Sequence, residues 1–293
     1  MSNAPSDQTA APISIMPVRR DLHFGLPPER IGNWHQLGGN ASHFFNALSL
    51  FFPDGERFFI HSVRNYRERI QDPTLNRAIT AFIGQEAMHS REHAECNELL
   101  DRAGLPGSQL QRRVAWIVGL LKSWLPKPVQ LSVTIALEHL TAIMANGVLE
   151  KPSAFDAAHP AYGNMWHWHA LEETEHKAVA YDVWNQVSGS NLLSYLLRCT
   201  VLVLATLVFA GLVVWFQRTL VHADPAARAE TRGGRVTFRY LFGKDGIFRS
   251  AIRDWFDYFR PGFHPWMHDN RRFLVDVEPL ADRVRTGEHV VAA

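Results

Sequence analysis

The sequence predicts an all-α protein, a four-helix bundle followed by a hydrophobic helical extension on the C-terminal side. Glycine and proline divide the 293-residue chain into helix-length segments, and no segment shows the alternating apolar and polar pattern of a β-strand. Two Glu-x-x-His tetrads, at 86–89 and 173–176, each follow a segment in which one glutamate lies among apolar residues. The order glutamate, tetrad, glutamate, tetrad is typical of a four-helix bundle that holds two metal ions.

Prolines and glycines indicate where the four bundle helices begin and end. Pro53 and Pro128 suit the first turn of a helix, where the missing N–H is not needed. A turn at 72–74 precedes the second helix, and Gly104 closes it. The expected helices span about 53–71, 74–103, 128–151 and 160–187.

The segments outside these helices differ in character. Residues 21–52 are rich in aromatic side chains and contain a Gly38-Gly39 pair, so this region is expected to be loop-like. Residues 114–125 form an amphipathic apolar stretch with Trp116 and Trp124. The chain is therefore divided into a flexible tail, a bundle with its N-terminal aromatic segment, and an extension packed on the bundle or a membrane, at 1–17, 18–190 and 191–293.

Composition and charge exclude several classes of protein. The formal net charge is +1, so no nucleic-acid partner is expected. Cys96 and Cys199 are isolated in the sequence, so neither a disulfide framework nor a zinc ribbon is indicated. Residues 1–17 lack the apolar stretch of a signal peptide, so the bundle is expected in a reducing cytoplasm.

Spacing along the helices tests whether the four ligand segments can meet. Glu56 lies about 17 residues before Pro73, and the first tetrad lies about 13 to 16 residues after it. At about 1.5 Å per residue, these levels agree to within about one turn in an antiparallel hairpin. Glu138 lies about 12 residues before the end of its helix, and Glu173 about 13 after the start of the next. The spacing therefore places all the ligand segments in one layer.

The predicted metal ligands are four carboxylates and two imidazoles: Glu56, Glu86, His89, Glu138, Glu173 and His176. Glutamate and histidine at i and i+3 project from one helix face, so each tetrad can offer a bridging carboxylate and a terminal imidazole. Oxygen and nitrogen ligands suit iron, which is favoured, with manganese and zinc as alternatives. Glu138 is the strongest single case, because residues 131–144 are otherwise almost wholly apolar.

Three further residues compete for places at the site. His93 lies seven residues after the glutamate of the first tetrad, and His169 lies seven before His176. Both share the ligand face, where each can bind metal or orient a ligand. Glu172 also shares a face with His176, at i and i+4. Glu173 is preferred to it because Glu173 repeats the spacing of the first tetrad.

Residues 192–216 form a hydrophobic segment interrupted mainly by Arg198, and its uncharged run, 199–216, is long enough to span a membrane. Three placements are open: a buried fifth helix, a helix that lies in one leaflet, and a full span. Basic residues follow the segment, so a full span would export the bundle without a signal peptide. The aromatic stretch 255–266 resembles an interfacial belt. Contact with the inner face of the cytoplasmic membrane is therefore favoured.

Three motifs resemble those of a known family. They are Phe-Ile-Gly-Gln-Glu-Ala-Met-His at 82–89, Glu-Thr-Glu-His at 173–176 and Tyr-Phe-Arg-Pro-Gly-Phe-His-Pro-Trp at 258–266. These motifs resemble bacterial proteins labelled predicted metal-dependent hydrolase, a family regarded as ferritin-like. The resemblance covers roughly residues 17–270, and the His-Pro-Trp stretch is its most specific part. It implies a ferritin-like fold, a metal site and, as a candidate activity, hydrolysis.

The residues favour a di-iron, oxygen-activating oxidoreductase that acts on a lipophilic substrate such as a fatty-acyl or terpenoid chain. Such an enzyme needs an electron donor as a partner. The first alternative is hydrolysis by a metal-activated water, which uses the same ligands. The second alternative is iron binding or storage. No residue outside the ligand set is identified as a catalytic acid or base.

Overall fold

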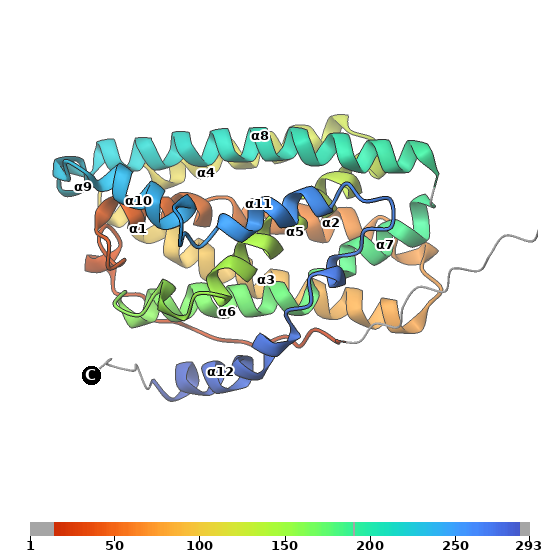
Figure 1. Cartoon of the computed structure of the whole chain (residues 1–293), viewed down its shortest axis with the longest axis horizontal. Helices are drawn as coiled ribbons and strands as arrows, with labels where there is room; N and C mark the ends of the chain where they lie inside the picture. The colour runs from red at the N-terminus through yellow and green to blue at the C-terminus, as the bar shows by residue number, and fades with distance from the viewer. Residues whose placement is uncertain (1–14, 190, 288–293) are drawn as a thin grey trace, which may run out of the picture.

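All regular elements are helices over the residues that the structure describes, 15–189 and 191–287 (Figure 1). The structure is a computed structural model. The prediction of an all-α fold is confirmed. Residues 1–14 of the tail expected at 1–17 lie outside the described residues.

Four helices carry the predicted ligands: α2 (Phe52–Arg64), α3 (Pro73–Arg102), α5 (Lys127–Leu149) and α6 (Pro160–His176). α2 packs along α3, α5 packs along α6, and α2 also contacts α5, so the four helices share a core. Pro53 lies in the first turn of α2, and the Asp72 side chain accepts a hydrogen bond from the backbone N–H of Thr74 at the start of α3. α3 ends shortly before Gly104, whose φ of 75° is a left-handed conformation that favours glycine.

The first bundle helix is shorter than the expected 53–71. α2 ends at Arg64, and a 3₁₀ turn (Arg67–Arg69) leads into the loop before α3. The side chain of Ile70 is buried, and Asn76 Nδ2 donates to the Ile70 carbonyl oxygen at 2.7 Å. These tertiary contacts fix the loop in place of the last helical turns.

The fourth expected helix, 160–187, is interrupted directly after the second tetrad. α6 ends at His176, and α7 (Val179–Ser188) continues the chain after a short break. The Thr174 hydroxyl donates to a carbonyl oxygen of the preceding turn at 3.1 Å, an arrangement that bends helices. The buried Lys177 ammonium donates to two groups of the C-terminal extension, which holds the chain in the bent form.

The region 21–52, expected to be loop-like, contains a buried helix, α1 (Gly39–Ser49). Every residue of α1 is buried, so the helix has no polar face and its sequence shows no amphipathic period. The Glu230 carboxylate accepts hydrogen bonds from the backbone N–H groups of Gly39 and Asn40, at 2.6 and 3.2 Å, and caps the helix from far along the chain. The expectation of a loop is wrong because nothing in the local sequence indicates that contact.

The remaining helices surround the core. α4 (Gly107–Trp124) covers α2 and α3 and contains residues 114–124 of the amphipathic stretch expected at 114–125. The extension contains α8 (Leu192–Ala223), α9 (Pro225–Ala229), α10 (Gly233–Phe242), α11 (Arg249–Asp257) and α12 (Val277–Thr286). α11 packs on α5 and α12 packs on α6. Further 3₁₀ turns lie at Pro28–Arg30, Pro152–Ala154, Pro265–Met267 and Arg271–Asp276.

α8 runs along one side of the molecule (Figure 1). Its inner face packs on α1 and α5, and buries Leu202 and Phe216. Its outer face exposes Leu204, Leu207 and Val208, by 56, 67 and 56 %. Of the three placements that the sequence leaves open, a fully buried fifth helix does not describe α8, because its outer face is exposed. By length and composition α5 and α8 could each cross a membrane, but α5 is mostly buried inside the molecule, whereas only 22 % of the apolar window of α8 is buried.

Candidate metal centre

The six predicted ligands meet in the core between α2, α3, α5 and α6. α2 and α5 each supply one glutamate, and α3 and α6 each supply one tetrad. All six residues are no more than 1 % exposed. The structure thus brings together the layer of side chains that the helix spacing predicts, and metal binding by these residues stays a prediction.

Candidate ligand atoms of this layer form two groups, and the atoms of each group lie within 4.8 Å of one another. The first group is Glu56, His89 and His169, and the second group is Glu86, Glu173 and His176. In the first group, His89 Nδ1 lies 3.9 Å from Glu56 Oε1. His169 was predicted only as an additional candidate, and here it belongs to the first group. Its Nε2 lies 3.3 Å from Glu173 Oε1, so His169 also connects the two groups.

The second group surrounds the imidazole of His176. Its Nε2 lies 3.2 Å from Glu86 Oε1 and 3.6 Å from Glu173 Oε1. Glu138 Oε2 lies 3.8 Å from the same nitrogen, so Glu138 adds a further carboxylate on this side. Glu173 lies between the two groups, because its Oε1 atom is close to both His169 and His176.

The ligand atoms that face the centre receive no hydrogen bond from the described part of the chain. They are five carboxylate oxygens and three imidazole nitrogens: Glu56 Oε1, both oxygens of Glu86 and of Glu138, His89 Nδ1, His169 Nε2 and His176 Nε2. Buried polar atoms are nearly always paired, and an unpaired one costs about 1–3 kcal/mol. Cations would satisfy all of them at once, so this donor set fits a metal centre.

Gln85 orients the imidazole of His176. Gln85 Nε2 donates to Glu175 Oε2 at 2.7 Å and to the Val18 carbonyl oxygen at 3.1 Å, which leaves Gln85 Oε1 as an acceptor. His176 Nδ1 lies 3.0 Å from that oxygen and donates its proton to it. The lone pair of the neutral imidazole is then on Nε2, the atom that faces the carboxylates.

Glu172 lies outside both groups and orients His89. His89 Nε2 lies 3.1 Å from Glu172 Oε2 and donates to it, which leaves Nδ1 free to face the centre. The buried guanidinium of Arg20 donates to Glu172 Oε1 at 3.0 Å and to both oxygens of Glu175 at 2.9 Å. Of the two competing glutamates, Glu173 therefore lies in a candidate ligand group, and Glu172 hydrogen-bonds to a candidate ligand, His89.

His93 lies behind His169 in a chain of hydrogen bonds. Asn97 Nδ2 donates to the Ser49 carbonyl oxygen at 3.1 Å, so Asn97 Oδ1 accepts from the Ser49 hydroxyl at 2.8 Å. Ser49 Oγ then accepts from His93 Nδ1 at 2.9 Å, and His93 Nε2 accepts from His169 Nδ1 at 3.1 Å. This order leaves the lone pair of His169 on Nε2, which faces the centre, so His93 orients a candidate ligand.

Burial and like charge prevent the centre from holding its full negative charge alone. Burial, followed by neighbouring carboxylates, raises the pKa of Glu86 well above its ordinary value, and burial raises the pKa of Glu138 to about 8. Burial would lower the pKa of His176, but Glu173 and Glu138 outweigh it and raise that pKa to about 9. Divalent cations would change this balance, because two of them neutralise four carboxylates.

Several polar residues of the centre were not predicted from the sequence. Ser90 Oγ donates to Glu56 Oε2 at 2.8 Å, and Thr141 Oγ1 donates to Glu173 Oε2 at 2.7 Å. Thr141 follows the α5 glutamate by three residues, so helical periodicity was a usable signal for it. Arg20 lies before the first helix, in a segment whose sequence shows no pattern that indicates its role.

Comparison with protein families gives one match. A family model described as predicted metal-dependent hydrolase matches residues 18–269, a range that contains both tetrads. Comparison with curated proteins and with solved structures gives no match. The family description agrees with the resemblance of the three motifs and with the buried ligand groups. It names hydrolysis, and it gives no support to the expectation of an oxygen-activating oxidoreductase.

Proposed function

The chain belongs to the family of predicted metal-dependent hydrolases, and we propose that its buried centre binds two metal ions and catalyses the hydrolysis of an ester bond. Metal binding is supported by the set of unpaired carboxylate and imidazole atoms at one level of four helices, and hydrolysis by the description of the family. A core with this many unpaired polar atoms is unfavourable unless cations bind there.

The two metal ions would be held by separate sets of side chains, with Glu173 between them. The first set is Glu56, His89 and His169, and the second is Glu86, Glu138, Glu173 and His176. Oxygen and nitrogen donors without a thiolate suit iron, manganese or zinc. Two divalent ions would balance the four carboxylates, which offsets the cost of burying them.

Bound metal ions would lower the pKa of a water molecule and polarise the scissile carbonyl group. The residues of the chain hold the ligands in place for that chemistry. Gln85 and Glu172 fix two imidazoles, and Thr141 holds one oxygen of Glu173 while the other faces His176. Burial of the whole layer keeps bulk water away from the ligands.

Ester hydrolysis by metal-loaded protein tests the proposal. p-Nitrophenyl acetate is expected to be hydrolysed by protein loaded with Fe²⁺, Mn²⁺ or Zn²⁺, and Glu86→Ala is expected to lose both activity and bound metal. Glu98→Ala is the matched control, because Glu98 lies on the same helix with its side chain 68 % exposed. Oxygen uptake with a reductant and no ester hydrolysis contradicts the proposal. Unchanged metal content in Glu86→Ala contradicts the ligand assignment.

We also propose that the outer faces of α4 and α8 contact the inner surface of the cytoplasmic membrane. α4 exposes Trp116 and Trp124 by 66 and 79 %, and α8 exposes a row of aliphatic side chains. Patches of this kind mark interaction surfaces, and tryptophan is favoured at the membrane interface. Arg112 and Lys122 on α4 add positive charge that attracts anionic lipid.

Sedimentation with vesicles tests this contact. The protein is expected to sediment with phosphatidylglycerol vesicles more than with phosphatidylcholine vesicles, and the double variant Trp116→Ser/Trp124→Ser is expected to stay in the supernatant. Equal recovery of the wild type in the supernatant with and without vesicles contradicts membrane contact.

A further inference from the structure

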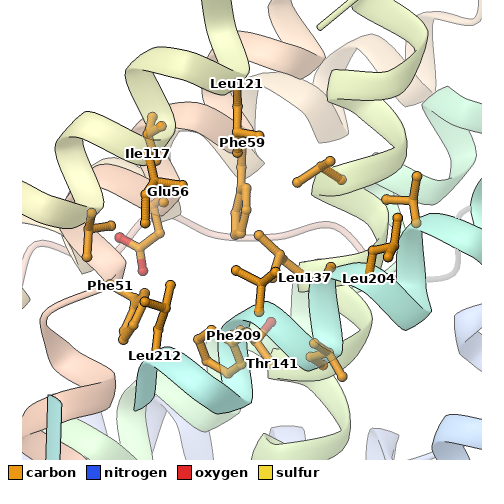
Figure 2. A pocket seen from close by; sticks show the side chains of 18 of the residues that line it. Phe51, Glu56, Phe59, Ile117, Leu121, Leu137, Thr141, Leu204, Phe209 and Leu212 are labelled. Carbon is orange, nitrogen blue, oxygen red and sulfur yellow. The ribbon is translucent and has the colours of Figure 1, made fainter. Parts of the chain in front are cut away.

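An apolar cavity of about 340 Å³ lies between α2, α4, α5 and α8 (Figure 2). Its volume is in the range of small-molecule pockets. Among the described residues that line it, Glu56 and Thr141 are the two with polar side chains, and the others are aliphatic, aromatic or glycine. No lysine or arginine is among these lining residues.

The cavity adjoins the candidate metal centre at Glu56. Glu56 is a member of the first ligand group, and Figure 2 shows its carboxylate among the apolar side chains that line the space. Thr141 lines the same space and donates its hydroxyl proton to Glu173, the carboxylate between the two groups. A molecule in the cavity would therefore reach the candidate metal ligands with one end.

The cavity also reaches the surface of the molecule, at α8. Leu204 and Val208 of α8 line it and are each 56 % exposed, whereas Glu56 is fully buried. Ile117 and Leu121 of α4 form part of the facing wall. The mouth thus opens on the surface that we propose to contact the membrane, and the cavity leads from there to the centre.

We propose that this cavity is a channel for one hydrocarbon chain, and that the substrate is an acyl ester whose ester group lies beside Glu56 and Thr141. This inference rests on the proposed hydrolytic function. A chain without polar groups fits walls that offer no hydrogen-bond partners, because a buried polar group without a partner is unfavourable. Sites for phosphoryl groups usually provide cationic side chains, which these walls lack, so a carboxylic ester fits better than a phosphoester.

The reaction at the end of the channel needs only water as a second reactant. The oxygen of water forms a bond to the acyl carbon, the bond between that carbon and the alkoxy oxygen breaks, and the alcohol leaves with a proton from the water. The fatty acid remains, with its chain in the channel. A free fatty acid is therefore a product that should bind without being turned over.

Glycine positions allow the channel to be blocked without a clash. Gly55 lines the cavity, and a Cβ built there meets no atom of the described chain within 4 Å. Gly55→Leu should therefore fill part of the channel, and leucine is more favourable than glycine within a helix. Gly119→Leu is the matched control: Gly119 also lies within a helix and has an unobstructed Cβ position, but it does not line the cavity.

A second pair of variants lies farther along the chain from any candidate ligand. Ala205 of α8 lines the channel, and Ala205→Phe places a ring in it. Ala210→Phe is its control, on an exposed position of the same helix outside the lining. Agreement between the two pairs would show that the effect comes from blocking the channel and not from a change beside Glu56.

Calorimetric titration with hexanoate, octanoate, decanoate and dodecanoate measures binding directly, with metal-loaded and metal-free protein. The affinity is expected to rise about fourfold with each methylene group until the channel is full. Gly55→Leu and Ala205→Phe should each weaken dodecanoate binding by at least about tenfold, since a bulky side chain displaces several methylene groups. The two control variants should bind dodecanoate as the wild type does, and metal content should be unchanged in all four.

The outcomes separate this inference from the proposed function. Chain-length-independent binding, or wild-type affinity in both blocked variants, overturns the channel even if p-nitrophenyl acetate is hydrolysed. Dodecanoate binding that both blocked variants lose supports the hydrocarbon channel even if no ester is hydrolysed, and in that case the proposed hydrolysis is wrong. A ratio of p-nitrophenyl dodecanoate to p-nitrophenyl acetate hydrolysis that falls in both blocked variants, and stays at the wild-type value in both control variants, supports both.

Discussion

Arg20 binds two buried carboxylates next to the candidate metal centre, and its removal is expected to destabilise the protein strongly. Arg20 is only 5 % exposed, and its guanidinium donates to Glu172 at 3.0 Å and to both oxygens of Glu175 at 2.9 Å. It also donates to the exposed Glu278 at 2.8 Å. Arg20→Met removes the charge and the hydrogen bonds while it keeps most of the packing of the aliphatic stem.

The magnitude follows from the burial of the partners. Glu172 and Glu175 are 0 and 7 % exposed, so Arg20→Met leaves both without their buried cation. Loss of one partner of a buried ion pair costs about 3–5 kcal/mol, and the exposed pair with Glu278 adds little. The free energy of unfolding of the metal-free protein should therefore fall by about 3–5 kcal/mol. Urea unfolding followed by tryptophan fluorescence measures this change.

A double variant separates the buried charge from lost packing. Arg20→Met/Glu175→Gln removes one of the unpaired negative charges, so it should be more stable than Arg20→Met by at least about 1 kcal/mol. A loss of less than about 1 kcal/mol in Arg20→Met, or a double variant that is no more stable than the single one, would contradict a stabilising role of the buried ion pairs of Arg20.

Three further changes have defined outcomes. Burial lowers the pKa of His35 to about 4, below the value of about 6.5 in an unfolded chain. The stability that the neutral, buried imidazole contributes is therefore complete above pH ~6.5, and it is lost as the pH falls toward ~4, because the unfolded chain takes up the proton first. Between pH ~7.5 and ~5 the wild type should lose about 2 kcal/mol of its free energy of unfolding through His35. Urea unfolding at the two pH values should show a loss that is smaller by this amount in His35→Phe. Gly147→Ala should destabilise the fold by about 1–3 kcal/mol, because the added Cβ would overlap a backbone carbonyl oxygen. Gly119→Ala, where the Cβ meets no atom of the described chain within 4 Å, should stabilise the fold by up to about 1 kcal/mol. Equal urea midpoints of unfolding for the two variants would contradict this. Gln85→Leu removes the acceptor of His176 Nδ1 and should weaken metal binding by about 10- to 100-fold in a competition titration with a chelator, and unchanged affinity would count against the orienting role.

The layer of candidate ligands was predictable because helix geometry is regular. Pro53, Pro73 and Gly104 indicate the bounds of two helices, and a fixed rise per residue then gives the level of each glutamate and tetrad. The structure brings those side chains together, with the all-α fold as expected. These features depend on local sequence, so the sequence alone was sufficient for them.

Features set by distant contacts were not predictable. α1 has no polar face, and its N-terminus is capped by Glu230 of the extension, so neither periodicity nor a local cap indicates it. Helical periodicity placed His93 and His169 on the same face but could not separate their roles. Those roles follow from the hydrogen bonds that connect His93 to Ser49, a residue of α1. Arg20 pairs with carboxylates of α6, more than 150 residues away in sequence.

Metal stoichiometry is the most direct test of the two-metal centre. Elemental analysis of protein purified without chelators is expected to give two transition-metal ions per chain for the wild type and for Glu98→Ala, and no more than one for Glu138→Ala. Circular dichroism should show the same helical content in all three proteins. Fewer than two ions in the wild type after reconstitution with excess metal, or two ions retained by Glu138→Ala, would contradict the two-metal account.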